Sequence, residues 1–117
     1  MQDYRKLDVW QRAHQLVLAV YTASASFPGR EAYSLTDQTR RAASSIPANI
    51  AEGCGRETNA ELRRFLYIAM GSASELDYHL LLAHDLSYLD AAIYQQLNDE
   101  LNIIRRMLNA LIQKLKG

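Results

Sequence analysis

The side chains able to bind a metal or attack a substrate are few in this 117-residue chain, which has three histidines and one cysteine. A dimetal site in a helical bundle uses Glu-x-x-His pairs, but the residue three after Glu75 is Tyr78, and the histidine is His79. His79 and His84 diverge around their helix, and Cys54 has no histidine or aspartate in an interpretable spacing. We therefore expect no catalytic residue, no metal, no cofactor, no small-molecule substrate and no enzymatic activity.

Two arginine doublets suggest a different chemistry, the binding of phosphate groups. Arg40-Arg41 and Arg63-Arg64 could face outward on helices and meet a nucleic-acid backbone. Tyr67, one turn beyond the second doublet, could stack on a base. Alternatively, these arginines pair with nearby acids, which are Glu52, Glu57, Glu61 and Glu75. We favour the ion pairs, because a formal net charge of zero argues against strong nonspecific binding of nucleic acid.

The stretch that positions the first doublet, Ser34 to Arg56, predicts one helix with two unlike faces. Small and apolar residues fall on one side at about 100° of turn per residue. Hydrogen-bonding residues fall together on another side and form a polar row, which consists of Gln38, Arg41, Ser45, Asn49, Glu52 and Arg56. Serine and asparagine are poor helix formers unless their side chains have partners. The row therefore predicts contacts, and the pattern leaves open whether it faces the bundle interior, a neighbouring subunit or solvent.

Four amphipathic segments fill the chain. Apolar residues recur in each at spacings of three and four, and strand-like alternation of useful length is lacking. We expect helices over roughly residues 8–27, 34–54, 59–85 and 90–116. Short connections between long helices imply antiparallel neighbours. The predicted fold is all-α, a single up-down-up-down antiparallel four-helix bundle that forms one domain over residues 1–117.

Local residue types predict the helix ends. Residue type and position predict N-terminal caps at Asp8, which has Gln11 at capping-box spacing, and at Ser34, Thr58 and Asp90. Gly53 and Gly55 flank a single residue, which suits a left-handed cap at the C-terminus of the second helix.

The third helix contains a run of small residues from Gly71 to Ser74, which would let another backbone approach closely. Glycine costs about 1 kcal/mol of helix propensity relative to alanine, so we expect a packing reason for Gly71. Glu75 follows this run directly. If the second helix packs here, Arg41, Ser45 or Asn49 could satisfy the Glu75 carboxylate, since a buried charge without a partner is strongly destabilising. We expect Glu75 to lie within this patch, so that Glu75→Ala lowers stability sharply or breaks assembly.

Charge is uneven along the last two helices. Six acidic residues and no lysine or arginine lie from Glu75 to Glu100, and the chain is basic beyond Glu100. This pattern indicates either solvated faces whose ends suit the helix dipole or head-to-tail attraction between subunits.

The single cysteine excludes an intrachain disulfide and fits a reducing compartment. The first residues, M-Q-D-Y-R-K-L-D, lack the apolar core of a signal peptide. No apolar run approaches the roughly 20 residues of a membrane span. We expect a cytoplasmic protein that does not enter a membrane.

The segment from Phe27 to Arg56, F-P-G-R-E-A-Y-S-L-T-D-Q-T-R-R-A-A-S-S-I-P-A-N-I-A-E-G-C-G-R, strongly resembles the signature of a bacterial four-helix bundle family, the 23S rRNA intervening-sequence proteins. Three further segments are similar to that family, L-D-V-W-Q-R-A (7–13), R-F-L-Y-I-A-M-G-S-A-S-E-L (64–76) and L-L-L-A-H-D-L-S-Y-L (80–89). The likeness extends to about Leu89, and the last helix matches only in pattern.

The resemblance implies a four-helix bundle that assembles as a homo-oligomer, a pentamer. Some members are encoded inside insertions in 23S rRNA genes, and the same fold serves accessory proteins of diversity-generating retroelements, which work with a reverse transcriptase. By that analogy the candidate nucleic-acid contacts are Arg40, Arg41, Arg56, Arg63 and Arg64. The family motif falls on Arg41, Ser45, Asn49, Glu52, Gly53, Gly71, Ser72 and Glu75, and it leaves open whether these bind a ligand or hold the bundle and its neighbours together.

Two functions follow. The first is a cytosolic scaffold or interaction module that binds copies of itself or another protein. The alternative is an RNA-binding protein linked to 23S rRNA intervening sequences or, on a weaker argument, a reverse-transcriptase accessory protein. We favour the first, because the chain lacks the net positive charge of the accessory type.

Overall fold

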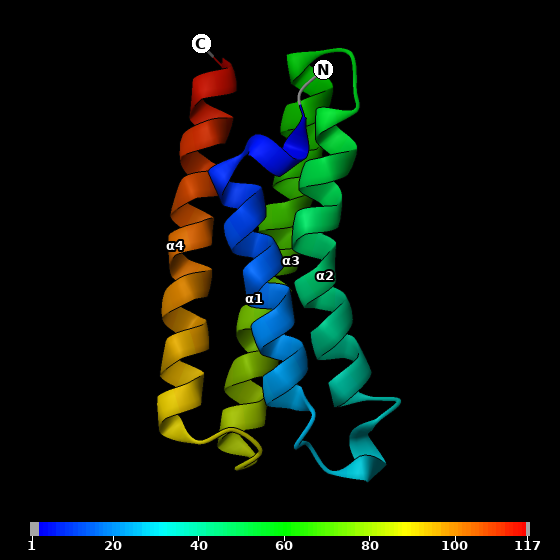
Figure 1. Cartoon of the computed structure of the whole chain (residues 1–117), viewed down its shortest axis with the longest axis vertical. Helices are drawn as coiled ribbons and strands as arrows, with labels where there is room; N and C mark the ends of the chain where they lie inside the picture. The colour runs from blue at the N-terminus through cyan, green and yellow to red at the C-terminus, as the bar shows by residue number, and fades with distance from the viewer. Residues whose placement is uncertain (1–2, 117) are drawn as a thin grey trace.

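The computed structural model describes residues 3–116 and shows four long helices side by side along one axis (Figure 1). The elements are η1 (Tyr4–Lys6), α1 (Asp8–Ser24), η2 (Gly29–Glu31), α2 (Leu35–Cys54), α3 (Asn59–Asp85) and α4 (Ala91–Lys116). Contacts join α1 to α2, α2 to α3, α3 to α4 and α4 to α1, so α1 and α3 lie on a diagonal. The predicted all-α, up-down-up-down four-helix bundle is confirmed.

One contiguous hydrophobic core occupies the centre of the bundle. Every helix contributes fully buried side chains to it, such as Leu16 of α1, Ile50 of α2, Leu76 of α3 and Ile104 of α4. Burying an aliphatic side chain of this size stabilises a protein by about 1.5–3 kcal/mol. The apolar residues that recur at spacings of three and four in the sequence therefore line the seam along which the helices meet. No helix among residues 3–116 is long and apolar enough to cross a membrane.

The α2–α3 pair makes the most extensive contact in the bundle, and small residues are the reason. Ala43, Ala69 and Ala73 are almost completely buried between the helices. A Cβ atom added to Gly53 would lie 2.8 Å from Leu62 Cδ1 and 2.9 Å from Phe65 Cβ, which is closer than real atoms pack. Gly53 therefore serves the close approach of α3 to α2.

The predicted left-handed cap at the end of α2 is wrong. Gly55, the cap residue, has φ −82° and ψ −4°, and no glycine in residues 3–116 has a positive φ. The left-handed residue instead follows α3, where Ser87 has φ 65°. The Tyr88 N–H then donates to the carbonyl of Ala83 at 2.8 Å, and this bond closes the end of α3.

Two of the four predicted N-terminal caps are confirmed. Asp8 is not a cap, because it is the first residue of α1 and Leu7 occupies the cap position without a side-chain bond. Thr58 accepts a hydrogen bond from the Glu61 amide at 3.1 Å, and Asp90 accepts one from the Ile93 amide at 2.8 Å. Ser34 occupies the cap position of α2, but its side chain makes no capping bond. Its hydroxyl donates to the Glu31 carboxylate instead, because η2 brings that acid within reach.

The first helix ends at Ser24, before the expected end at Phe27. The Ser24 hydroxyl donates back to the Val20 carbonyl at 2.7 Å, and the Phe27 amide bonds to the Ser24 carbonyl in a tighter turn. Pro28 disfavours helical geometry at the residue before it. These local bonds close α1 one turn early.

Candidate interaction surface

Three polar side chains form a chain of hydrogen bonds along the seam between α2 and α3. Asn49 Nδ2 donates to Ser45 Oγ at 2.9 Å, and Ser45 Oγ lies 2.8 Å from Ser72 Oγ. The Ser72 hydroxyl donates to the Ile68 carbonyl at 3.2 Å. One direction of donation, from Asn49 through Ser45 and Ser72 to Ile68, satisfies the whole chain. The middle of the polar row thus lies half-buried at the edge of the seam.

A groove of about 400 Å³ opens beside this seam. Its lining residues are Gln38, Arg41, Ala42, Ser45, Ser72 and Glu75. The Arg41 side chain is 79% exposed and forms an ion pair with Asp37, one turn earlier in the same helix, at 3.6 Å. Glu75 is exposed and has no ion pair with any residue in the range 3–116. Opposite charges therefore line one groove without meeting.

Glu75 lies in one groove with Arg41 and Ser45 of α2, but the partner expected for its carboxylate is not found among residues 3–116, and the side chain is exposed. Leu76 is the residue that α3 directs into the core, with 0% exposure. Because successive helical residues are rotated by about 100°, the neighbouring Glu75 leaves the helix toward solvent. The small residue that packs against the core is Ala73, whereas Gly71 is exposed.

The outward side of α3 carries large apolar side chains in solvent. Tyr67 is 49% exposed, Ile68 41%, Tyr78 59% and Leu81 42%. Gly71 lies among them along the helix, and no atom lies within 4 Å of a Cβ placed on it. We call these five residues the α3 outer face. Residues 3–116 show no packing reason for Gly71. A helix with exposed apolar groups around a glycine is suited to contact with another protein.

Two of the five candidate nucleic-acid contacts join helices within the chain. Arg40 Nε donates to Ser24 Oγ at 2.8 Å, and its guanidinium lies 4.7 Å from the centre of the Tyr21 ring. Arg63 donates to the carbonyl of Leu115 at 3.0 Å, which ties α3 to the end of α4. The predicted pairing of these two arginines with nearby acids is not seen among the described residues, because backbone and hydroxyl oxygens accept their hydrogen bonds.

The other arginines near the α2–α3 turn surround an aromatic ring. Arg56 and Arg64 lie 4.9 Å and 4.6 Å from the centre of the Phe65 ring. Arg56 also pairs with Glu52, one turn earlier, at 2.7 Å, although the expected partners of Glu52 were the arginine doublets. Arg41 lies near the start of α2, about 20 Å away at 1.5 Å of rise per residue. The five arginines are therefore split between the two ends of the bundle.

Charge is segregated along the long axis. The stretch from Glu75 to Glu100 forms the later part of α3, the α3–α4 turn and the first part of α4, in the lower part of Figure 1. The C-terminus of α4, the N-terminal segment and the α2–α3 turn meet at the top. We call this the basic end, and its cationic residues are Arg5, Lys6, Arg56, Arg63, Arg64, Lys114 and Lys116. Acidic residues in the same segments offset much of this charge, namely Asp3, Asp8, Glu52, Glu57 and Glu61.

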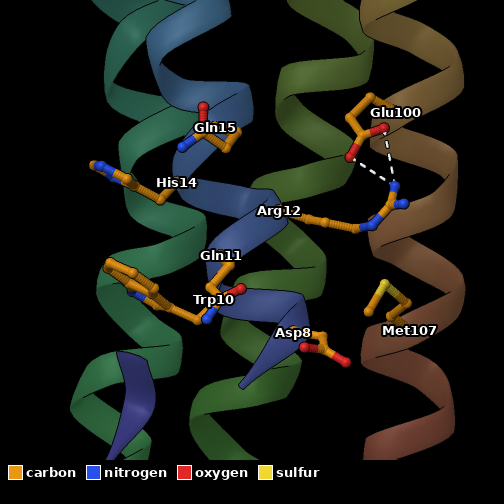
Figure 2. A pocket seen from close by; sticks show the side chains of 8 residues that line it. All are labelled: Asp8, Trp10, Gln11, Arg12, His14, Gln15, Glu100 and Met107. Atoms are coloured by element: carbon orange, nitrogen blue, oxygen red, sulfur yellow. Dashed lines mark hydrogen bonds and ion pairs between the residues drawn. The ribbon is translucent and has the colours of Figure 1, made fainter. Parts of the chain in front are cut away.

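Figure 2 shows a second groove, of about 750 Å³, which the sequence did not suggest. Arg12 of α1 reaches across to Glu100 of α4 and bonds both carboxylate oxygens, at 3.0 Å and 3.1 Å. On the other side of α1, the rings of Trp10 and His14 stack with centres 5.1 Å apart and planes 6° apart. Trp10 belongs to the apolar stripe of α1 and packs against the edge of the core. No local signal pairs Arg12 with Glu100, because the two residues are 88 positions apart.

Groups that could support catalysis are not gathered in this structure. Within residues 3–116, no three or more His, Cys, Asp or Glu side chains are grouped so that they could hold a metal ion. Cys54 is 2% exposed, and burial raises the pKa of its thiol. A raised pKa keeps the thiol protonated, so the thiolate needed for nucleophilic attack is scarce. The arrangement offers surfaces for binding.

Comparison with known proteins gives a consistent result. The family model described as 23S rRNA-intervening sequence protein matches residues 5–110. No curated protein sequence matches the chain. A crystal structure of a protein of unknown function from the S23 ribosomal protein family of Bacteroides thetaiotaomicron superimposes with a TM-score of 0.83. It is 23% identical in sequence, and the match covers 89% of this chain and 97% of that one. At this identity the likeness shows the shared fold.

Proposed function

Because the chain belongs to the family of 23S rRNA-intervening sequence proteins, we propose that it is a non-enzymatic interaction module that assembles with copies of itself through the α3 outer face. The family resemblance implies five subunits and a cytoplasmic location, which the single buried cysteine suits. Assembly through this face would leave the other surfaces of the bundle free to bind partners, which is the scaffold role.

The observation that carries this proposal is the exposure of Tyr67, Ile68, Tyr78 and Leu81 around Gly71 on one helix. Glycine in a helix interior is destabilising by about 1 kcal/mol relative to alanine, and no neighbour from the described part of the chain needs the space at Gly71. Aromatic residues are enriched in protein interfaces, where they supply large contact area. A neighbouring copy that packs over the glycine accounts for both features.

The test is the mass of the protein in solution, measured by analytical ultracentrifugation over micromolar concentrations. The wild-type mass should be a multiple of 13.3 kDa. Tyr78→Glu should shift the protein toward single subunits, because it places a charge in the contact. Tyr33→Glu is the matched control, since Tyr33 is 98% exposed and lies outside the α3 outer face. A wild-type protein that stays at 13.3 kDa would contradict the proposal.

A second candidate function, RNA binding, is favoured by the gathering of cationic residues at the basic end. Arg64, Lys114 and Lys116 are exposed there. In an oligomer whose subunits point the same way, these weak patches would be repeated on one side, and binding would strengthen through avidity. This role would fit the association of the family with ribosomal RNA genes.

The RNA proposal is tested by titrating a structured RNA with the intact protein at low and at physiological salt. The triple change Arg64→Ala, Lys114→Ala and Lys116→Ala should weaken binding and lower its salt dependence, by a slope of about one for each phosphate that the variant no longer binds. Arg30→Ala, at the opposite end of the bundle, is the control. Absence of binding at physiological salt to ribosomal RNA fragments would leave the protein scaffold.

A further inference from the structure

The groove between α2 and α3 presents one positive and one negative charge that are not paired with each other. Arg41 and Glu75 both line it, but they form no ion pair in the described chain. The one ion-pair partner of Arg41 within residues 3–116 is Asp37, at 3.6 Å and 48% exposed. Solvent-exposed pairs of this kind within one helix are weak. Both charges therefore remain available to a partner.

Arg41 and Glu75 lie at the same level along the long axis of the bundle. The Ser45–Ser72 contact fixes the register of α2 against α3, with the two oxygens 2.8 Å apart. Arg41 is about one turn from Ser45, and Glu75 is about one turn from Ser72. Because α2 and α3 are antiparallel, both steps lead toward the same end of the bundle. Arg41 and Glu75 thus form a lateral pair of opposite charges across the groove.

The floor of the groove is poorly suited to a small polar ligand. The hydroxyls of Ser45 and Ser72 are engaged in the hydrogen-bond chain with Asn49 and Ile68. The groups available for specific recognition are therefore the charged side chains at the rim, Arg41 and Glu75. A surface with both signs at one level along the bundle can be complementary in charge to a second copy of itself. The exposed Ile68, whose carbonyl bonds Ser72, provides apolar area one helical turn from the groove.

We infer that Arg41 of one copy forms an ion pair with Glu75 of a neighbouring copy, and that this contact selects the partner and its register. The inference rests on the proposed self-assembly and assigns the charged contact within it. Opposite charges across an interface favour the correct partner and disfavour others. Exclusion of water between the two copies would strengthen such a pair relative to one in water.

The experiment is a charge-reversal cycle on the intact protein, with subunit dissociation measured by analytical ultracentrifugation. Arg41→Glu and Glu75→Arg should each raise the dissociation constant at least about thirtyfold. The double variant, which carries both changes, restores opposite charges and should recover most of the wild-type affinity. Circular dichroism and thermal unfolding establish that each variant is folded. Arg30→Glu, a reversal outside the groove, is the matched control and should assemble normally.

The outcomes separate this inference from the proposed function. Single variants that assemble as well as wild type would overturn the ion pair while leaving self-assembly intact. Single variants that dissociate and are not rescued by the double change would also overturn it. A wild-type protein that is monomeric throughout would overturn both.

Discussion

The hydroxyl oxygens of Ser45 and Ser72 lie 2.8 Å apart and join α2 to α3 at the edge of their seam. The contact turns two residues that are poor helix formers into a cross-link between helices. Asn49 supports it from the same face of α2 by donating to both the carbonyl and the hydroxyl of Ser45. The polar row on α2 is thus partly structural, and Arg41, one of its exposed members, is left to bind a partner.

Removing the Ser45 hydroxyl should destabilise the fold. Ser45→Ala deletes the bond to Ser72 and one bond from Asn49, and each such hydrogen bond contributes about 0.5–1.5 kcal/mol. The expected result is a lower midpoint of urea unfolding. Ser44→Ala is the control, because the Ser44 hydroxyl bonds only within its own helix, to the Arg41 carbonyl at 3.3 Å. Equal midpoints for the two variants would show that the cross-link is not stabilising.

The two helical glycines should respond to alanine in opposite ways. Gly53→Ala places a methyl group 2.9 Å from Phe65 Cβ, and overpacking of this kind costs about 1–3 kcal/mol. Gly71→Ala meets no atom within 4 Å, so the subunit should gain up to about 1 kcal/mol of helix propensity. Thermal unfolding of each variant in the Tyr78→Glu background, where the proposed contact between copies is disrupted, measures the difference for the subunit alone. A stabilised Gly53→Ala protein would show that α3 can move away from α2 without cost.

Replacing His79 by leucine should leave the fold as stable or make it more stable. The side chain is 8% exposed, and its Nδ1 atom is buried with no hydrogen-bond partner in the described structure. An unsatisfied buried polar group costs about 1–3 kcal/mol, which an apolar side chain avoids. Urea unfolding of His79→Leu provides the measurement, with His84→Leu as the comparison because His84 Nδ1 lies 3.3 Å from Asp85. A loss of more than about 1 kcal/mol would indicate that His79 has a partner.

Ser34→Ala should make stability less dependent on pH in the acid range. Hydrogen bonds from Ser34 and then Tyr88 lower the pKa of Glu31 below its ordinary value of 4.5. A lowered folded-state pKa gives stability that is present above the unfolded value and is lost as the pH falls through the folded value. The variant should therefore be less stable than wild type near neutral pH and equal to it once Glu31 is protonated.

Urea midpoints measured from neutral pH to below the folded-state pKa of Glu31 test this difference. Tyr88→Phe removes the other bond, which is 2.8 Å long, and should have a smaller effect of the same sign. Tyr33→Phe is the control, since Tyr33 is 98% exposed. If Ser34→Ala is less stable than wild type by the same amount at every pH, the effect comes from backbone conformation and not from the ionisation of Glu31.

Ser87→Gly should stabilise the turn between α3 and α4. Ser87 has φ 65°, a left-handed conformation in which a Cβ atom is strained by about 1–2 kcal/mol. Glycine adopts it freely, although it loses more entropy on folding, so the expected net gain is below about 1 kcal/mol. Thermal unfolding measures it, and Ser26→Gly, outside the helices, serves as the comparison. A lower melting temperature for Ser87→Gly would show that the serine makes a contact that outweighs the strain.

Features that depend on a few neighbouring residues were predictable from the sequence. The caps at Thr58 and Asp90 follow from residue type and position alone, and the helices follow from apolar spacing. Ser34 fails as a cap because its hydroxyl finds the Glu31 carboxylate, whose position is set by η2. Glycine is common both in turns and where helices pack closely. The sequence therefore could not show whether Gly53 was part of a helix cap or was needed for its contact with Leu62 and Phe65.

The site was less predictable, because it depends on how helices far apart in sequence are rotated against each other. The polar row and the small-residue run were both recognised, but the exposure of Glu75 is set by its neighbour Leu76 taking the core position. The Arg12–Glu100 pair joins the first helix to the last. No local pattern contains that information, since each residue alone looks like an ordinary solvated charge.

The separation of charge along the bundle has a practical consequence for handling the protein. With a sequence isoelectric point of about 6.8, the molecule is nearly uncharged as a whole at neutral pH. A charged chromatography resin nevertheless interacts mainly with the end of the bundle that faces it. The protein should be retained at low ionic strength by both cation-exchange and anion-exchange columns. Modest salt should release it from either, since the Debye length shortens to about 8 Å near 0.15 M.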